Sequence, residues 1–167
     1  RQRQMCIRDS SYTTTTGSVR LVRKIVNSAG NTWYETSTGA FAYSGDITIV
    51  ASPTINNLNL AISNKGTKPY ISANIGYSSE NKPKSWSLAY GTTTALGTAH
   101  TETFTDSVLS AYNPVPISVQ FGTEEPELRY GTKYYYRLSV TAQRGEVVSV
   151  EGHFTTEKCT NHTWDSG

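Results

Sequence analysis

The sequence predicts an all-β protein. Tyrosine, threonine, serine, valine and isoleucine are plentiful, while long stretches rich in alanine, leucine, glutamate and lysine are missing, a composition that favours strands over helices. Short segments of alternating apolar and polar residues follow one another, and turn sequences with glycine, asparagine and proline separate them. This periodicity alone predicts a β-sandwich or a β-barrel.

The clearest pattern is a pair of long strands between Leu128 and Thr156. In each strand, every second residue forms a mostly apolar face. These residues are Tyr134, Tyr136, Leu138 and Val140 in the first strand and Val148, Val150, Gly152 and Phe154 in the second. Such alternation is typical of a strand with one buried and one exposed face. The turn sequence Gln143 to Glu146 lies between the two strands, so we expect a β-hairpin.

The N-terminal part divides into two pieces of different character. Residues 1–10 have no alternation and no helical stripe and are similar to translated adaptor sequence, so we expect a non-native leader. Residues 11–51 are expected to be a partial β-rich segment of a preceding module. Within it, 18–26 and 32–36 predict a hairpin, and 46–50 predict a further short strand.

Five more strands are predicted between Pro53 and the C-terminal hairpin. Their apolar positions alternate over 55–62, 71–77, 86–90, 100–104 and 117–121. Asn56 and Asn57 interrupt the first of these strands and predict a β-bulge. Residues 106–114 show no clear period.

The residues that open the hairpin resemble a known family. Leu128, Gly131-Thr132 and Tyr134 are similar to the run that opens the sixth strand of fibronectin type III domains. Tyr130 stands where that family usually has proline. The closing run Gly152 to Thr156 is similar to the family's last strand.

This resemblance covers most of the chain and implies an immunoglobulin-like sandwich of about seven strands over residues 53–157. It also implies that the Tyr134 hydroxyl bonds to backbone a few residues upstream, the arrangement called a tyrosine corner. The run from Ala89 to Thr92 is similar to a strand end in bacterial members of the family. Structural roles are implied for Leu128, Gly131, Trp86 and Tyr77, the last of which occupies the position where the family commonly buries a tryptophan.

Composition and charge argue against several classes of function. The formal net charge is +2, and because residues 1–10 supply the excess, the rest of the chain lacks the basic cluster of a nucleic-acid-binding protein. No apolar run approaches the ~20 residues of a membrane span, and residues 1–10 lack the apolar centre of a signal peptide. Cys6 and Cys159 lie near opposite ends, so we expect no disulfide scaffold.

The residues that could carry chemistry form no catalytic motif. The histidines are His100, His153 and His162. None belongs to a hydrolase, metalloprotease or phosphate-binding motif, so we expect a non-enzymatic protein with no catalytic residue and no cofactor. The glutamates between 124 and 127 are expected to form a solvated loop rather than a calcium site. Arg144-Gly145-Glu146 is expected to be a plain turn rather than an integrin-binding signal.

Two interpretations remain open for the aromatic residues of the N-terminal segment, Trp33, Tyr34, Phe41 and Tyr43. They form either the buried side of the hairpin, which we favour, or an exposed platform for sugar. Tyr135 could belong to an outward-facing row of tyrosines that acts as an adhesive surface. The strand propensity of tyrosine explains the row more simply. An exposed coplanar row of Trp33, Tyr34, Trp86 or Tyr135 would indicate a carbohydrate-binding surface.

Residues 158–167 are expected to be a linker or the start of a truncated Cys/His-containing repeat. They resemble the beginning of such repeats in large surface proteins of gut bacteria. Cys159 and His162 have the Cys-x2-His spacing of two zinc ligands. A tetrahedral site needs four ligands, so we expect no metal in this fragment.

These features predict a non-catalytic spacer, scaffold or adhesion module of a bacterial multidomain protein that is secreted or attached to the cell wall. The alternative is a carbohydrate-binding accessory module of a secreted glycan-degrading enzyme. The expected partners are neighbouring domains of the same chain and a host or cell-wall glycan or protein. We expect a monomer that binds no nucleic acid.

Overall fold

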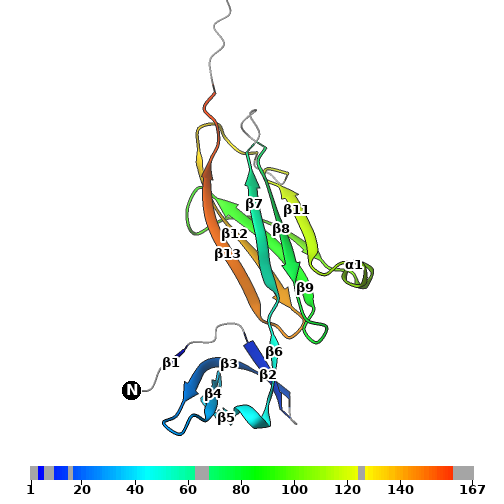
Figure 1. The fold of residues 1–167 in the computed structure, drawn as a ribbon. Coiled ribbons are helices and arrows are strands. Elements are labelled where there is room, and N and C mark those ends of the chain that lie inside the picture. The colour runs from blue at the N-terminus through cyan, green and yellow to red at the C-terminus, as the bar shows by residue number, and fades with distance from the viewer. Residues whose placement is uncertain (1–3, 6–9, 15–16, 63–67, 124–126, 160–167) are drawn as a thin grey trace, which may run out of the picture.

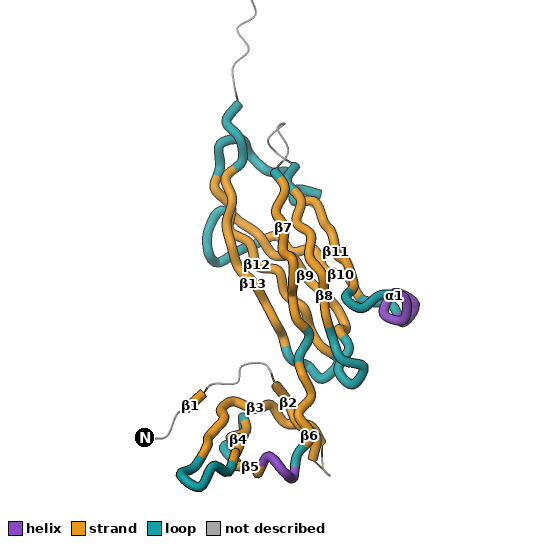
Figure 2. The backbone as a smooth tube through the Cα atoms, viewed as in Figure 1, coloured by secondary structure: helices purple, strands orange, loops and turns teal. Residues whose placement is uncertain are grey.

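The computed structural model describes residues 4–5, 10–14, 17–62, 68–123 and 127–159 (Figure 1). A small N-terminal sheet is followed by a β-sandwich (Figure 2). Every pair of neighbouring strands in these sheets is antiparallel. The all-β, immunoglobulin-like fold predicted from the sequence is confirmed.

The N-terminal sheet is built around one long strand, β3. Its strands are β1 (Gln4–Met5), β2 (Ser10–Thr14), β3 (Gly17–Val26), β4 (Thr32–Thr36), β5 (Phe41–Tyr43) and β6 (Thr48–Ala51). They are ordered β5-β4-β3-β2-β6, β1 also pairs with β3, and the 3-10 helix η1 (Ser44–Asp46) links β5 to β6. The predicted hairpin is β3–β4, whereas β2 was not predicted.

A small core lies on one side of this sheet. Leu21 and Tyr34 are buried together, and Ala42 and Ile47 pack against them. Because the residues of a strand alternate between its two faces, burial of Tyr34 places its neighbour Trp33 on the opposite, exposed face. The sequence alone did not separate these two aromatic residues.

The sandwich contains the seven predicted strands in two sheets. A three-stranded sheet has the order β11-β8-β7, and a four-stranded sheet has the order β10-β9-β12-β13. The strands are β7 (Thr54–Ala61), β8 (Tyr70–Gly76), β9 (Pro83–Gly91), β10 (Thr98–Thr103), β11 (Val115–Gln120), β12 (Lys133–Ala142) and β13 (Val147–Thr155). The predicted bulge lies in β7, where the register shifts between Asn56 and Asn59 and Asn57 adopts a positive φ of 51°.

Aromatic rings in the core connect the two sheets, and buried aliphatic side chains pack around them. Phe121, which follows β11, is fully buried, and its ring centroid lies 5.3 Å from that of Tyr90, 5.9 Å from that of Tyr136 and 4.7 Å from that of Phe154. These three partners come from β9, β12 and β13, so one side chain contacts three strands of the opposite sheet. Such tilted and edge-on ring pairs stabilise a core beyond simple area burial.

Tyr136 also explains a glycine in the partner strand. Tyr136 pairs with Gly152 across β12 and β13, and a Cβ at position 152 would lie 2.7 Å from Cζ of the tyrosine ring. Because Gly152 has no side chain, the Tyr136 ring can pack directly against the backbone of β13. Burial raises the pKa of Tyr136 above the ordinary value of a tyrosine, so its hydroxyl stays protonated further into the alkaline range.

The segment after the second strand contains a helix that the sequence did not predict, and the place expected for Tyr77 requires correction. Residues 106–111, which showed no period, form the helix α1 (Asp106–Ala111), capped by the Thr105 side chain, which accepts a hydrogen bond from the Val108 N–H. Tyr77 is not a core residue in the place of a tryptophan. Strand β8 ends at Gly76, and the Tyr77 hydroxyl donates to carbonyl groups at the end of α1, those of Leu109 and Tyr112.

We predict that residues 53–157 fold without the N-terminal sheet, because the sandwich has its own continuous core. A polypeptide of that span should unfold in one cooperative thermal transition when followed by circular dichroism. As a control, Phe121→Ala in the same span should lower its free energy of unfolding by about 3–5 kcal/mol. Absence of a cooperative transition would show that the sandwich depends on the N-terminal sheet.

Candidate functional site

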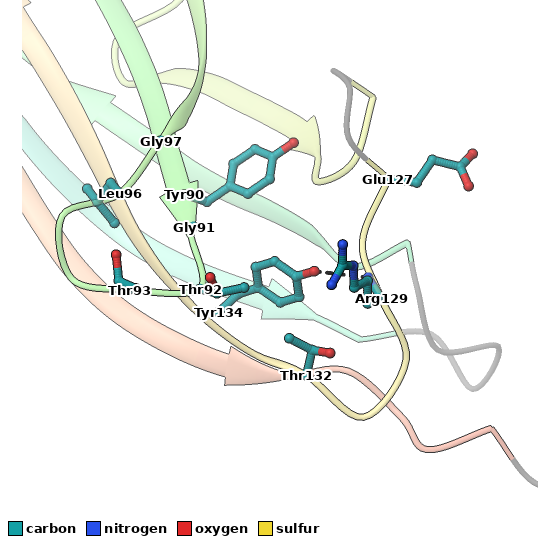
Figure 3. A pocket seen from close by; sticks show the side chains of 10 residues that line it. All are labelled: Tyr90, Gly91, Thr92, Thr93, Leu96, Gly97, Glu127, Arg129, Thr132 and Tyr134. Carbon is teal, nitrogen blue, oxygen red and sulfur yellow. Dashed lines mark hydrogen bonds between the residues drawn. The ribbon is translucent and has the colours of Figure 1, made fainter.

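The loop before β12 is fixed by the hydroxyl group of one tyrosine. The backbone N–H of Arg129 donates to the Tyr134 hydroxyl at 2.9 Å (Figure 3). Leu128 is buried beneath this loop, and Gly131 has a positive φ of 61°, which suits glycine at a tight turn. The Gly131 N–H donates to the Glu157 carbonyl at 2.7 Å, so the same loop holds the segment that follows β13.

A pocket of about 400 Å³ opens beside this loop. The residues that line it are Tyr90, Gly91, Thr92, Thr93, Leu96, Gly97, Glu127, Arg129, Thr132 and Tyr134 (Figure 3). Both tyrosine hydroxyls accept hydrogen bonds from backbone, that of Tyr90 from the Gly122 N–H at 3.1 Å. The lining offers threonine hydroxyls and exposed charges for hydrogen bonding. Among the described residues that line it, there is no histidine, cysteine or pair of carboxylates that could activate a nucleophile.

The histidines lie far apart within the described chain. His100 on β10 lies 3.0 Å from Glu102, and its ring centroid lies 5.6 Å from that of Trp86. His153 is exposed on β13, beside Tyr135 at a centroid distance of 6.2 Å. Since β10 and β13 are the two outer strands of the four-stranded sheet, these imidazoles share no site.

Of the two candidate zinc ligands, the structure describes only Cys159. Cys159 is exposed and has a free thiol, and His162 lies outside the described residues, as do Glu124 and Glu125. Among the residues described, no group of three or more histidine, cysteine, aspartate or glutamate side chains could hold a metal ion.

The turn between β12 and β13 is tied to the loop between β8 and β9. Asn81 is fully buried, its side-chain amide donates to the Glu146 carboxylate at 3.1 Å, and its side-chain oxygen accepts from the Arg144 N–H at 3.4 Å. The Arg144 guanidinium donates to the Glu80 carbonyl at 3.2 Å. Both charged side chains of the Arg-Gly-Glu turn are therefore engaged within the fold. Nothing in the sequence distinguished Asn81 from other loop asparagines.

The candidate aromatic surface differs from the row considered in the sequence. Tyr34 is 6% exposed and Trp86 is 3% exposed, so neither can belong to an exposed row. Both side chains point from their strands into a core, and Tyr135 is half-buried on the sandwich. Trp33 is instead exposed beside Tyr43 and Phe41 on the N-terminal sheet. The preferred expectation that these three residues are buried is wrong.

We predict that Tyr134→Phe lowers the free energy of unfolding by roughly 1 kcal/mol or more, because the half-buried N–H of Arg129 loses its acceptor. Chemical denaturation followed by fluorescence measures this change. Tyr135→Phe, on the neighbouring and more exposed position, is the matched control and should stay within about 0.5 kcal/mol of the wild type. Equal stability of the two variants would show that the Tyr134 hydroxyl does not stabilise this loop.

Comparison with models of known protein families gives no match, and comparison with curated protein sequences gives no significant match. Within the described residues, no helix has the length and apolar character needed to cross a membrane.

Proposed function

We propose that the chain is a non-catalytic spacer or adhesion module, with a fibronectin type III-like sandwich, from an extracellular bacterial multidomain protein. The observation that carries the proposal is the direct joint between the N-terminal sheet and the sandwich (Figure 1). Strand β6 ends at Ala51 and β7 begins at Thr54, so Ser52 and Pro53 alone connect them. A connection this short restricts how two folded units can move.

Buried side chains at this joint restrict it further. The Asn81 amide donates to the Ala51 carbonyl at 3.3 Å, across the boundary between the two parts. Pro53 is fully buried and has a fixed φ, so the linking backbone is held by packing as well as by hydrogen bonding. Asn81 also bonds Glu146 and Arg144, and it therefore ties the linker to two turns of the sandwich.

The path of the chain suits a role in spacing. Strand β7 leaves the joint, and β13 ends at the opposite end of the sandwich (Figure 1). Modules connected in this manner add length in one direction. The resemblance to fibronectin type III domains supports the proposal through the anchored Tyr134 and the division of seven strands into sheets of three and four. It also supports the expectation of an extracellular, wall-attached or secreted parent protein.

The alternative, a carbohydrate-binding accessory module of a glycan-degrading enzyme, required an exposed coplanar row. That row is lost through burial of Tyr34 and Trp86. We therefore assign spacing to the sandwich and its joint, and sugar binding is not needed for that role.

We predict that Asn81→Ala loosens the joint, because the Ala51 carbonyl, the Arg144 N–H and the Glu146 carboxylate lose a shared partner. Residual dipolar couplings of backbone amides measure the effect. In the wild type, one alignment tensor should fit both residues 20–50 and residues 54–157. In the variant the two parts should need tensors of different magnitude, and the free energy of unfolding should fall by roughly 1–3 kcal/mol.

Asn59→Ala is the matched control, because Asn59 is an exposed asparagine of β7 away from the joint. It should leave the single tensor unchanged. If the wild type already needs two tensors of different magnitude, the joint is flexible and the proposed rigid spacing is wrong.

A further inference from the structure

The exposed face of the N-terminal sheet carries an ordered group of aromatic and charged side chains. Residues that pair directly across neighbouring strands share a face of the sheet. One row across β3, β4 and β5 is Ile25, Trp33 and Tyr43, and the next row is Arg23, Glu35 and Phe41. We call these six residues the aromatic face.

The three rings of the aromatic face are accessible to a ligand. Trp33 is 38% exposed, Tyr43 is 37% exposed and Phe41 is 55% exposed. Trp33 and Tyr43 contact one another with ring centroids 5.3 Å apart. Gly45 lies against the Tyr43 ring, since a Cβ there would be only 2.8 Å from its Cε1 atom, and this close backbone restricts the ring. The rings are thus partly preorganised, which lowers the entropic cost of binding.

An ion pair lies among the rings. A terminal nitrogen of Arg23 lies 2.6 Å from Oε2 of Glu35, and both side chains are partly exposed. The pair places hydrogen-bond donors and acceptors beside apolar rings, while its charges offset one another. A ligand that fits this surface needs apolar faces, many hydroxyl groups and no net charge.

We infer that the aromatic face binds a neutral, soluble glycan chain. The C–H faces of pyranose rings stack on the aromatic rings, and the sugar hydroxyls bond to the Arg23 and Glu35 side chains. Because Trp33 and Tyr43 are tilted by 53°, they form an angled seat. Such a seat fits a soluble chain whose successive sugars change orientation, whereas a crystalline polysaccharide requires a flat one.

The size of the face favours a glycan over a protein. With 38%, 37% and 55% of their surfaces exposed, the three rings offer roughly 200–300 Å², from 150–250 Å² per aromatic side chain. A standard protein interface needs about 800 Å² from each partner. A second copy of the chain that docked on these three rings alone would therefore bury too little area for a stable dimer. The inference goes beyond the proposed spacing function and does not depend on it.

The test uses the full chain and four neutral hexasaccharides, those of cellulose, xylan, mannan and chitin. Isothermal titration calorimetry measures affinity, and the indole N–H resonance of Trp33 reports the location of binding. At least one hexasaccharide should bind and shift this resonance. Trp33→Ala should weaken that binding at least about tenfold, and Phe41→Ala and Glu35→Gln should each weaken it severalfold.

Tyr112→Ala is the matched control, because Tyr112 is as exposed as Phe41 but lies at the end of α1 on the sandwich. It should leave the affinity unchanged. Circular dichroism shows whether each variant is folded, and should Trp33→Ala unfold, Phe41→Ala and Glu35→Gln still decide the result. The inference is overturned by absence of binding to all four hexasaccharides at millimolar concentration, by binding that the folded variants leave intact, or by a sedimenting dimer that Phe41→Ala dissociates.

Discussion

Contact between aromatic rings across the two sheets is the interaction on which the sandwich depends. The two cysteines of the chain lie near its opposite ends, so the packing of the core has to hold the sheets together. Phe121 extends from the three-stranded sheet and touches rings from β9, β12 and β13. This arrangement fixes the separation of the sheets and makes Gly152 necessary opposite Tyr136.

At the two ends of the sandwich, different side chains provide hydrogen bonds to the backbone of the turns. Backbone groups of buried turns need hydrogen-bond partners where the strand ladders stop. At one end the Tyr134 hydroxyl and the buried Thr156 hydroxyl serve the loop before β12. At the other end the Asn81 side chain serves the β12–β13 turn and the incoming linker. The core sets the position of the strands, and these few polar groups determine where the chain enters and leaves.

The sequence predicted the sandwich strands because each strand has one solvent-exposed and one buried face. Apolar residues such as Tyr134, Tyr136 and Leu138 therefore recur at every second position. It did not reveal α1, since this single turn and a half buries only Leu109 and has no helical stripe; Thr105 followed by Asp106 was the available capping signal. The role of Asn81 depends on groups far away in the chain and leaves no local pattern. One part of the aromatic face could be predicted from the sequence, namely the pairing of Arg23 with Glu35. These two residues are equally far from the centre of the β3–β4 turn, and the geometry of a hairpin pairs such positions.

The two roles that we propose, spacing and glycan binding, use separate parts of this molecule. A pull on the two ends of the sandwich acts along its strands, because the chain enters at the start of β7 and leaves at the end of β13 (Figure 1). Hydrogen bonds of antiparallel ladders lie perpendicular to the strands, so those between β7 and β8 are loaded together in shear. The aromatic face belongs to β3, β4 and β5, whereas the linker leaves from β6 at the other side of the sheet order. Under these proposals, a glycan on Trp33 would load the joint at Asn81 without contacting the side chains that hydrogen-bond there.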